Sequence, residues 1–166
     1  GAATVFPEVL VAPTLSVADN VYLGQDRWTR FAVRGPERRA RVAAVLEEIS
    51  TQPFDPGAPV AELDLVRRHQ VAIARALLSE PRLLILDEST AALDVSERDR
   101  LFEAVRRRVA AGVAVIFISH RLDEVLNLSD AVTVLSSGRK VATLGRGEIT
   151  EARLLALLNP DREVTA

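Results

Sequence analysis

Hydrophobic and polar positions follow a different pattern in each half of the chain. Up to residue 80 the apolar residues recur at helical spacing, which predicts helices over residues 16–24, 35–49 and 61–80. Beyond residue 80, continuous apolar runs predict strands buried on both faces at 83–86 and 113–119, separated and followed by helices at 96–112, 121–128 and 150–158. This alternation of strands and helices indicates an α/β structure with a parallel sheet.

Cap and turn residues mark the ends of several predicted elements. Ser16, with Asp19 three residues later, is typical of a helix start. Ser96 and Asp99 show the same spacing and predict the start of the helix after the first buried strand. A Ser-Ser-Gly-Arg tetrapeptide predicts a β-hairpin between two apolar segments, 131–135 and 140–144.

Composition narrows the class of protein. The 166 residues are 48% hydrophobic and 27% charged, with a formal net charge of -2 and no cysteine. These values fit one globular domain, and they exclude disulfides, cysteine metal sites and a broad electrostatic field for nucleic acid. Basic clusters at 67–69 and 106–108 are therefore interpreted as solvated helix faces rather than nucleic-acid contacts.

Two predicted strands end in polar residues that are suited to chemistry. The run over 83–86 leads into Asp87 and Glu88, and the run over 113–119 leads into His120. Ligands bind beyond the carboxyl ends of strands in open α/β sheets. There one carboxylate can hold Mg²⁺, a second can activate water, and histidine can donate a hydrogen bond to phosphate. Solvated charges at a strand end and a surface histidine are the alternatives.

Taken together, ordered motifs over nearly the whole chain resemble the ATPase domain of ABC transporters. Residues 83–88 are similar to the Walker B strand, 91–94 to the D-loop, and His120 to the switch histidine, while 13–24 and 118–124 resemble sugar-import members. The resemblance implies an α/β, incomplete P-loop NTPase (ABC ATPase-like) fold. In it, a helical subdomain is followed by a partial, mainly parallel sheet with flanking helices.

The resemblance also implies roles for individual residues. Asp87 is expected to hold Mg²⁺, and Glu88 is expected to act as the general base on the attacking water. His120 is expected to contact the γ-phosphate of ATP, and Asp94 is expected to help pair two ATPase subunits.

The same resemblance implies an organisation and a set of partners. A strand end and Q-loop region is expected over residues 1–12, a helical subdomain over 13–80, and an α/β part over 81–166. The helical subdomain is expected to touch a membrane permease, and a second ATP-binding domain is expected to complete a dimer. The parent complex is then cytoplasmic and peripheral at the inner face of the cell membrane.

Several positions depart from the family pattern. The sequence contains no Gly-x-x-x-x-Gly-Lys-Ser/Thr P-loop, and Pro7 stands where the family has the Q-loop glutamine. The signature Leu-Ser-Gly-Gly-Gln aligns with Leu63 to Arg67, so that Asp64 and Val66 replace serine and glycine. Asp64 is expected to cap the following helix and to place negative charge where a phosphate would come, which Arg67 offsets only in part.

These observations favour one function and leave others open. The chain is interpreted as an ATP-binding and ATP-hydrolysing subunit, or a piece of one, of an ABC importer for a sugar or a similar small solute. Its intact parent would use ATP and Mg²⁺, whereas this chain alone is expected not to hydrolyse ATP. The alternatives are a non-catalytic module that docks on a permease or another ATPase half, and the ATPase head of a DNA-repair or chromosome-maintenance protein.

The start of the chain adds one expectation. It begins at Gly1 and contains no methionine, so we expect a processed or truncated segment. Loss of upstream strands is expected to uncover sides of the strand over 83–86 and of its neighbours. Self-association through the exposed sheet edge is then expected.

Overall fold

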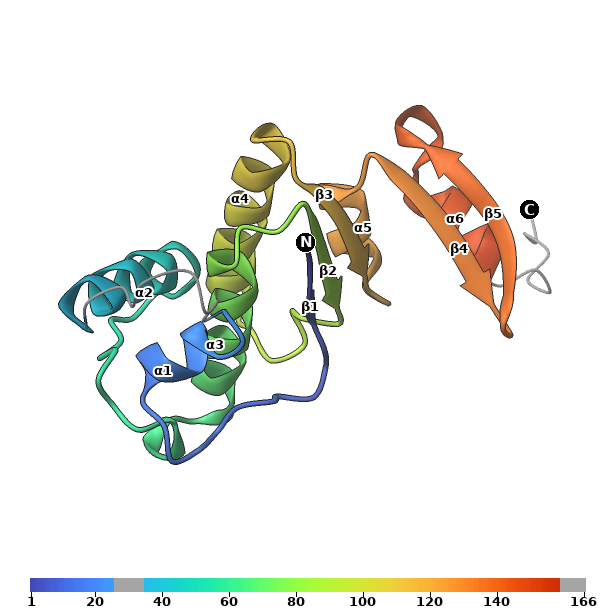
Figure 1. Ribbon diagram of the computed structural model, residues 1–166. Coiled ribbons are helices and arrows are strands. Elements are labelled where there is room, and N and C mark those ends of the chain that lie inside the picture. Colours follow the sequence, from blue (N-terminus) through green and yellow to red (C-terminus); the bar gives the residue numbers. More distant parts are fainter. Residues whose placement is uncertain (26–34, 159–166) are drawn as a thin grey trace. The chain divides into compact units, whose positions relative to one another are not determined.

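The chain forms two compact units (Figure 1). The computed structural model describes residues 1–25 and 35–158. The first unit spans Gly1–Ile118 and contains a three-stranded parallel sheet, and the second begins at Ser119 and contains an antiparallel hairpin. Within the described ranges, no helix has both the length and the apolar character needed to cross a bilayer.

The sheet of the first unit has its second strand at the centre. Strands β1 (Ala2–Val5), β2 (Leu83–Asp87) and β3 (Ala114–Ile118) run in parallel in the order β1-β2-β3. The expectation of a bare edge over 83–86 is therefore wrong, because β2 pairs with a strand on each side. Among the described residues, the two edges of this sheet belong to β1 and β3.

One face of this sheet is covered more completely than the other. Leu84 and Leu86 of β2 are completely buried, whereas Ile116 and Ile118 of β3 remain 49% and 46% exposed. The prediction of strands buried on both faces is therefore wrong. Its physical reason is that helices pack against one face, where Phe117 meets Phe102 of α4 edge to face with ring centroids 5.7 Å apart.

Among the residues that the structure describes, four helices accompany the sheet of the first unit. They are α1 (Val17–Tyr22), α2 (Gly35–Ile49), α3 (Leu65–Leu78) and α4 (Val95–Ala110), with a 3-10 turn at Val60–Glu62. Helix α3 packs on α1 and α2, and α2 also packs on α4. One face of α2 is buried as its apolar spacing predicts, through Val42, Val45, Leu46 and Ile49. The predicted helix over 61–80 is shorter in the structure, because it begins only after Asp64.

Ion pairs join α2 to α4 and correct one interpretation of the sequence. Arg107 lies 3.4 Å from Glu48, and Arg108 also pairs with this carboxylate. Arg100 donates a hydrogen bond to the carbonyl of Glu47 at 3.1 Å. The cluster over 106–108 is therefore more than a solvated face, since two of its arginines fasten one helix to another.

The second unit is a hairpin packed on helix α6. It contains α5 (Leu122–Leu128), β4 (Ala131–Ser136), β5 (Arg139–Gly145), a 3-10 turn (Arg146–Glu148) and α6 (Glu151–Leu158). Val134, Leu144 and Leu154 form its small core. The predicted hairpin is confirmed: Ser137 and Gly138 connect the strands with φ angles of 49° and 73°. Positive φ at both central residues is typical of the type I′ turn that matches the twist of paired strands.

Candidate functional site

Asp87 and Glu88 lie at the carboxyl end of β2, the central strand of the sheet. Asp87 is the last residue of the strand and pairs in register with Ile118 of β3. The backbone N–H of Glu88 donates to the carbonyl of Ile118 at 3.0 Å, which ties the next residue to the neighbouring strand. Both carboxylate residues are half-buried. Two adjacent acids therefore lie beyond the carboxyl ends of the strands, where open α/β sheets bind ligands.

Glu88 has an unusual backbone conformation. Its φ angle is +46°, in the left-handed region that a residue with a side chain rarely adopts. The carbonyl of Glu88 accepts a hydrogen bond from Ala91 at 3.2 Å, so the chain turns sharply after the strand. Strained backbone of this kind costs about 1–3 kcal/mol and gathers at functional sites. Glu80 and Ser137 have similar φ angles, so the strain supports a functional role for Glu88 only together with its place beside Asp87.

Asp87 fits the role of a magnesium ligand in its chemistry. Mg²⁺ prefers carboxylate oxygens and keeps several waters, so in phosphate-transfer sites one or two protein carboxylates are enough. Within residues 1–25 and 35–158, no group of three or more His, Asp or Glu side chains is arranged as a metal site. The donor set suits a loosely held hard cation that shares its ligands with a phosphate, and it does not suit a closed structural metal.

Asp94 caps helix α4. Its Oδ1 accepts a hydrogen bond from the backbone N–H of Glu97 at 2.8 Å, and Glu97 Oε2 lies 3.4 Å from the N–H of Asp94. This reciprocal pair is a capping box, and it shows that the start predicted from Ser96 and Asp99 is two residues too late. The cap fixes the D-loop-like segment at the first turn of the helix that packs on β3.

The degenerate signature segment is organised around Asp64. Its Oδ1 accepts from the backbone N–H of Arg67 at 2.8 Å, so the predicted N-cap is confirmed. Leu63 beside it is only 9% exposed. The Arg67 guanidinium donates to Gln52 Oε1 at 2.8 Å and lies 5.3 Å from the centre of the Phe54 ring. Arg67 is thus directed at the loop before α3, where it holds two side chains.

A buried polar bridge, which the sequence analysis missed, links α3 to the segment after β2. His69 Nε2 lies 2.7 Å from the carbonyl oxygen of Ser89, and Gln70 Nε2 donates to Glu97 Oε1 at 2.9 Å. A carbonyl only accepts, so Nε2 carries the hydrogen of the imidazole. Burial lowers the pKa of His69 below 6.5, and the hydrogen bond to Ser89 opposes this shift. His69 is neutral near pH 7 and does not belong to a solvated basic face.

The bridge could have been anticipated only in part. Gln70 follows the apolar positions of α3 at a spacing that places it inward, but periodicity alone does not name its partner. Glu97 is 27 positions further along the sequence, and its buried position became visible only in the fold.

The remaining predicted positions lie apart from this cluster in sequence. Pro7 and Glu8 are exposed in a bend after β1. His120 is exposed, and it belongs to the second unit, whereas Asp87 and Glu88 belong to the first. The structure thus brings the two acids, the α4 cap and the α3 bridge together within one unit.

A cavity of about 300 Å³ lies elsewhere in the first unit. Its walls include the edge of β1, Glu8, Gln25 and one side of α3. Arg75 lines it as well and donates to the carbonyls of Leu10 at 2.9 Å and Asn20 at 2.8 Å. None of the predicted site residues lines this cavity, so it is separate from the candidate site.

The partial parallel sheet, with two acids at the end of its central strand, has the α/β architecture of the P-loop NTPase fold class. Residues 1–91 match the ABC transporter family. This match covers more than half of the sequence, and the chain belongs to that family.

Curated relatives carry sugar-import names. Ribose import ATP-binding protein RbsA 3 of Rubrobacter xylanophilus is 38% identical over 158 residues, which cover 95% of this chain and 32% of the relative. A putative ribose/galactose/methyl galactoside import ATP-binding protein of Agrobacterium fabrum is 37% identical over the same length. The chain spans about a third of the length of these relatives.

Known structures confirm the fold. The ATP-binding cassette MJ0796, in a dimeric post-hydrolysis state with ADP and Pi, has a TM-score of 0.78 and 23% identity over 87% of this chain and 62% of its own. The cbiO1 protein of Clostridium perfringens, part of the ABC transporter complex cbiONQ, has a TM-score of 0.69 and 25% identity over 97% of this chain and 64% of its own. The expected ABC ATPase-like fold with a partial parallel sheet is therefore confirmed.

Proposed function

We propose that this chain forms part of the ATP-binding subunit of an ABC importer for a sugar or a similar small solute. The observation that carries the proposal is the pair Asp87 and Glu88 at the carboxyl end of the central strand, with Glu88 held in a left-handed conformation. The sugar-import names of relatives at 37–38% identity support the substrate class.

The proposed chemistry divides among a few side chains. Asp87 would hold Mg²⁺, which when bound supplies charge that offsets the phosphates of ATP. Glu88 would accept a proton from the attacking water, since its carboxylate is half-buried beside the Asp87 position. His120 would donate a hydrogen bond to the γ-phosphate, and Asp94 would contribute to pairing with a second ATP-binding domain.

The signature segment, residues 63–67, should contribute less to nucleotide binding than the family's Leu-Ser-Gly-Gly-Gln does. Leu63, Asp64 and Arg67 would be the residues that face ATP across a dimer, by their alignment with the family signature. Asp64 uses its carboxylate to satisfy a helix N–H and adds a negative charge, and Arg67 is engaged with Gln52. A helix N-terminus attracts anions only while its N–H groups are available. ATP binding through this segment should therefore be weak.

The partners proposed from the family are a membrane permease and a second ATP-binding domain. The permease would meet the helical region over 13–80, and the complex would lie at the cytoplasmic face of the membrane. The capped signature and Pro7 favour one alternative, a non-catalytic module that docks on a permease or another ATPase half.

A chimera separates these two functions. The part of the RbsA 3 relative that precedes its matched region would be joined to Gly1, and Mg²⁺-dependent ATP hydrolysis would be measured. We expect hydrolysis that Glu88→Gln abolishes and that Glu80→Gln, an exposed control after α3, leaves unchanged. A folded chimera that binds ATP without hydrolysing it would contradict the catalytic proposal and support the docking module.

The 166 residues alone should not bind the nucleotide. They contain no glycine-rich P-loop, and phosphoryl transfer depends almost entirely on positioning and charge. Isothermal titration calorimetry with Mg²⁺ and ATP should show no saturable heat up to millimolar nucleotide. Saturable binding that Asp87→Asn weakens would mean that another element replaces the P-loop.

A further inference from the structure

We infer that Glu124 is a positioning residue for His120, because it fixes the backbone turn that carries the histidine. The inference depends on the proposed function, because only that function gives His120 a role. The contacts that support the inference lie entirely within the second unit. They involve four residues around the end of β3 and the start of α5.

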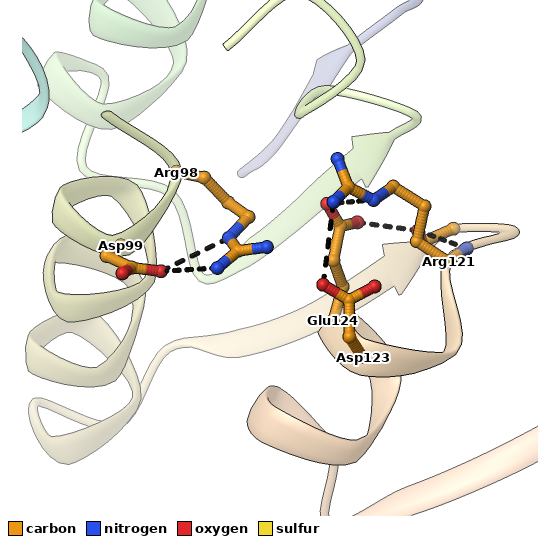
Figure 2. A network of polar contacts seen from close by, with 6 residues as sticks. Arg98, Asp99, Arg121, Asp123 and Glu124 are labelled. Atoms are coloured by element: carbon orange, nitrogen blue, oxygen red, sulfur yellow. Dashed lines mark hydrogen bonds and ion pairs between the residues drawn. The ribbon is translucent and has the colours of Figure 1, made fainter. Parts of the chain in front are cut away.

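Glu124 is a fully buried acid that faces Arg121 (Figure 2). Its Oε2 accepts a hydrogen bond from Ser119 Oγ at 2.6 Å, and its Oε1 lies 3.4 Å from Arg121 Nε. Ser119 precedes the histidine and Arg121 follows it. One carboxylate therefore contacts both neighbours of the exposed imidazole.

Ser119 relays this contact to the backbone. Its Oγ accepts the backbone N–H of Arg121 at 3.0 Å while it donates to Glu124. Arg121 is the N-cap of α5 and makes no capping hydrogen bond with its own side chain. Glu124 is the third residue of that helix, the position from which a capping box reaches back to the N-cap N–H. Here the serine hydroxyl stands between the two, so the loop containing His120 is closed by the relay.

The charges around Arg121 strengthen the closure. Its Nη2 lies 3.5 Å from Asp123 Oδ2, so the guanidinium faces two acids of the same helix (Figure 2). A buried carboxylate is costly unless it is hydrogen-bonded and paired. Ser119 supplies such a hydrogen bond to Glu124, and Arg121 supplies such an ion pair. These contacts thus restrain the backbone on both sides of His120.

Such restraint matters for a group that must meet a phosphate. A misplacement of about 1 Å in a catalytic constellation can cost about 100-fold in rate. Residues that hold the backbone of a functional group therefore contribute to the reaction without contact with the substrate.

The test uses the ring signals of the two histidines in the chain, His69 and His120. Isotope-labelled histidine gives two resolved ring systems, and the variant His69→Gln assigns them. Line broadening of the His120 ring and amide hydrogen exchange at Arg121 would be measured in Ser119→Ala, Ser119→Thr and Glu124→Gln. Arg146→Ala is the matched control, because it removes an exposed ion pair with Asp130 in the same unit.

We expect Ser119→Ala to broaden the His120 signal and to speed exchange at Arg121 by about tenfold, as loss of one hydrogen bond predicts. Ser119→Thr keeps the hydroxyl and should restore both readouts. Glu124→Gln keeps an acceptor but loses the charge opposite Arg121, so it should give an intermediate result. The His69 ring and the β4–β5 hairpin amides should not change.

An unchanged His120 signal and unchanged Arg121 exchange in folded Ser119→Ala would overturn the inference. Equal disturbance of the hairpin amides would overturn it as well, since Glu124 would then support the whole unit rather than the histidine. Neither readout requires ATP, so failure of the proposed function would leave these results unchanged and be recognised separately.

Discussion

Glu88 and Glu80 both adopt left-handed backbone, with φ angles of 46° and 47°, and only one of them lies at the candidate site. This conformation costs a residue with a side chain about 1–2 kcal/mol, which glycine avoids at the expense of a larger entropy loss on folding. We expect Glu88→Gly to raise the free energy of unfolding by about 0.5 kcal/mol in urea denaturation. Glu80→Gly should give the same gain as a control away from the site.

The opposite result at Glu88 alone would be informative. A loss of stability in Glu88→Gly together with a gain in Glu80→Gly would mean that the Glu88 side chain stabilises the fold. Its strained backbone would then have a structural explanation and would no longer favour catalysis.

The buried imidazole of His69 makes the free energy of unfolding depend on pH, in a direction that its lowered pKa fixes. Its folded pKa is lowered by burial, so below pH 6.5 the unfolded chain binds more protons than the folded chain. The stabilisation is present above the unfolded pKa and is lost as the pH falls through the folded pKa. His69→Gln keeps a donor for the Ser89 carbonyl but cannot be protonated. Between pH 7.5 and 5.5, urea denaturation should show a smaller loss of stability in this variant than in the wild type.

The carboxylates titrate in both proteins, so the comparison isolates the histidine. Equal slopes with pH in the wild type and in His69→Gln would contradict the assignment of a buried, neutral imidazole.

At the scale of single elements, substitutions of Asp64 distinguish the helix cap that it provides to α3 from the negative charge that it carries. Asp64→Ala should lower the free energy of unfolding by about 1 kcal/mol, because a helix N–H loses its acceptor. Asp64→Ser restores the residue type of the family pattern and remains a good cap, so its stability should stay within about 0.5 kcal/mol of the wild type. Thermal and urea denaturation measure both. A stable alanine variant would show that Asp64 is not an effective cap.

Elements with local signals were predictable from sequence. The hairpin was predicted because its two-residue turn needs particular residues. The start of α1 was predicted from the spacing of Ser16 and Asp19, and in the structure Ser16 Oγ accepts from the Asp19 N–H at 3.1 Å. The start of α4 was misplaced because two overlapping residue pairs fit one capping pattern. Only the fold shows that Glu97 turns inward to Gln70.

Contacts between distant elements were not predictable in the same way. Asp87 and Glu88 could be singled out because a strand ends at them. The His69–Ser89 bridge depends on α3 lying beside the turn after β2. The spacing of apolar residues along the chain does not predict which elements lie side by side. The half-exposed face of β3 was missed for the same reason, since an apolar run does not show which of its faces a helix covers.

For the whole molecule, the free edge of β3 predicts self-association. The strand is at the edge of the sheet among the described residues and exposes Ile116 and Ile118. An apolar edge with unpaired backbone groups is a template for another strand. Sedimentation equilibrium should show dimers that Ile116→Lys weakens, whereas Val109→Lys on α4, which is 44% exposed, should leave them unchanged. A monomer at millimolar concentration would contradict this prediction.

The parallel pairing of β1 with β2 has a consequence for synthesis on the ribosome. Ala2 pairs with Leu83, so about eighty residues of chain must be made between the two partners. At about 5–20 residues per second, β1 waits roughly 4–16 s before its neighbour exists. Helices, whose contacts are local, form in far less than a second. During that interval β1 lacks its β2 partner, and a chaperone that covers the strand would be most useful then.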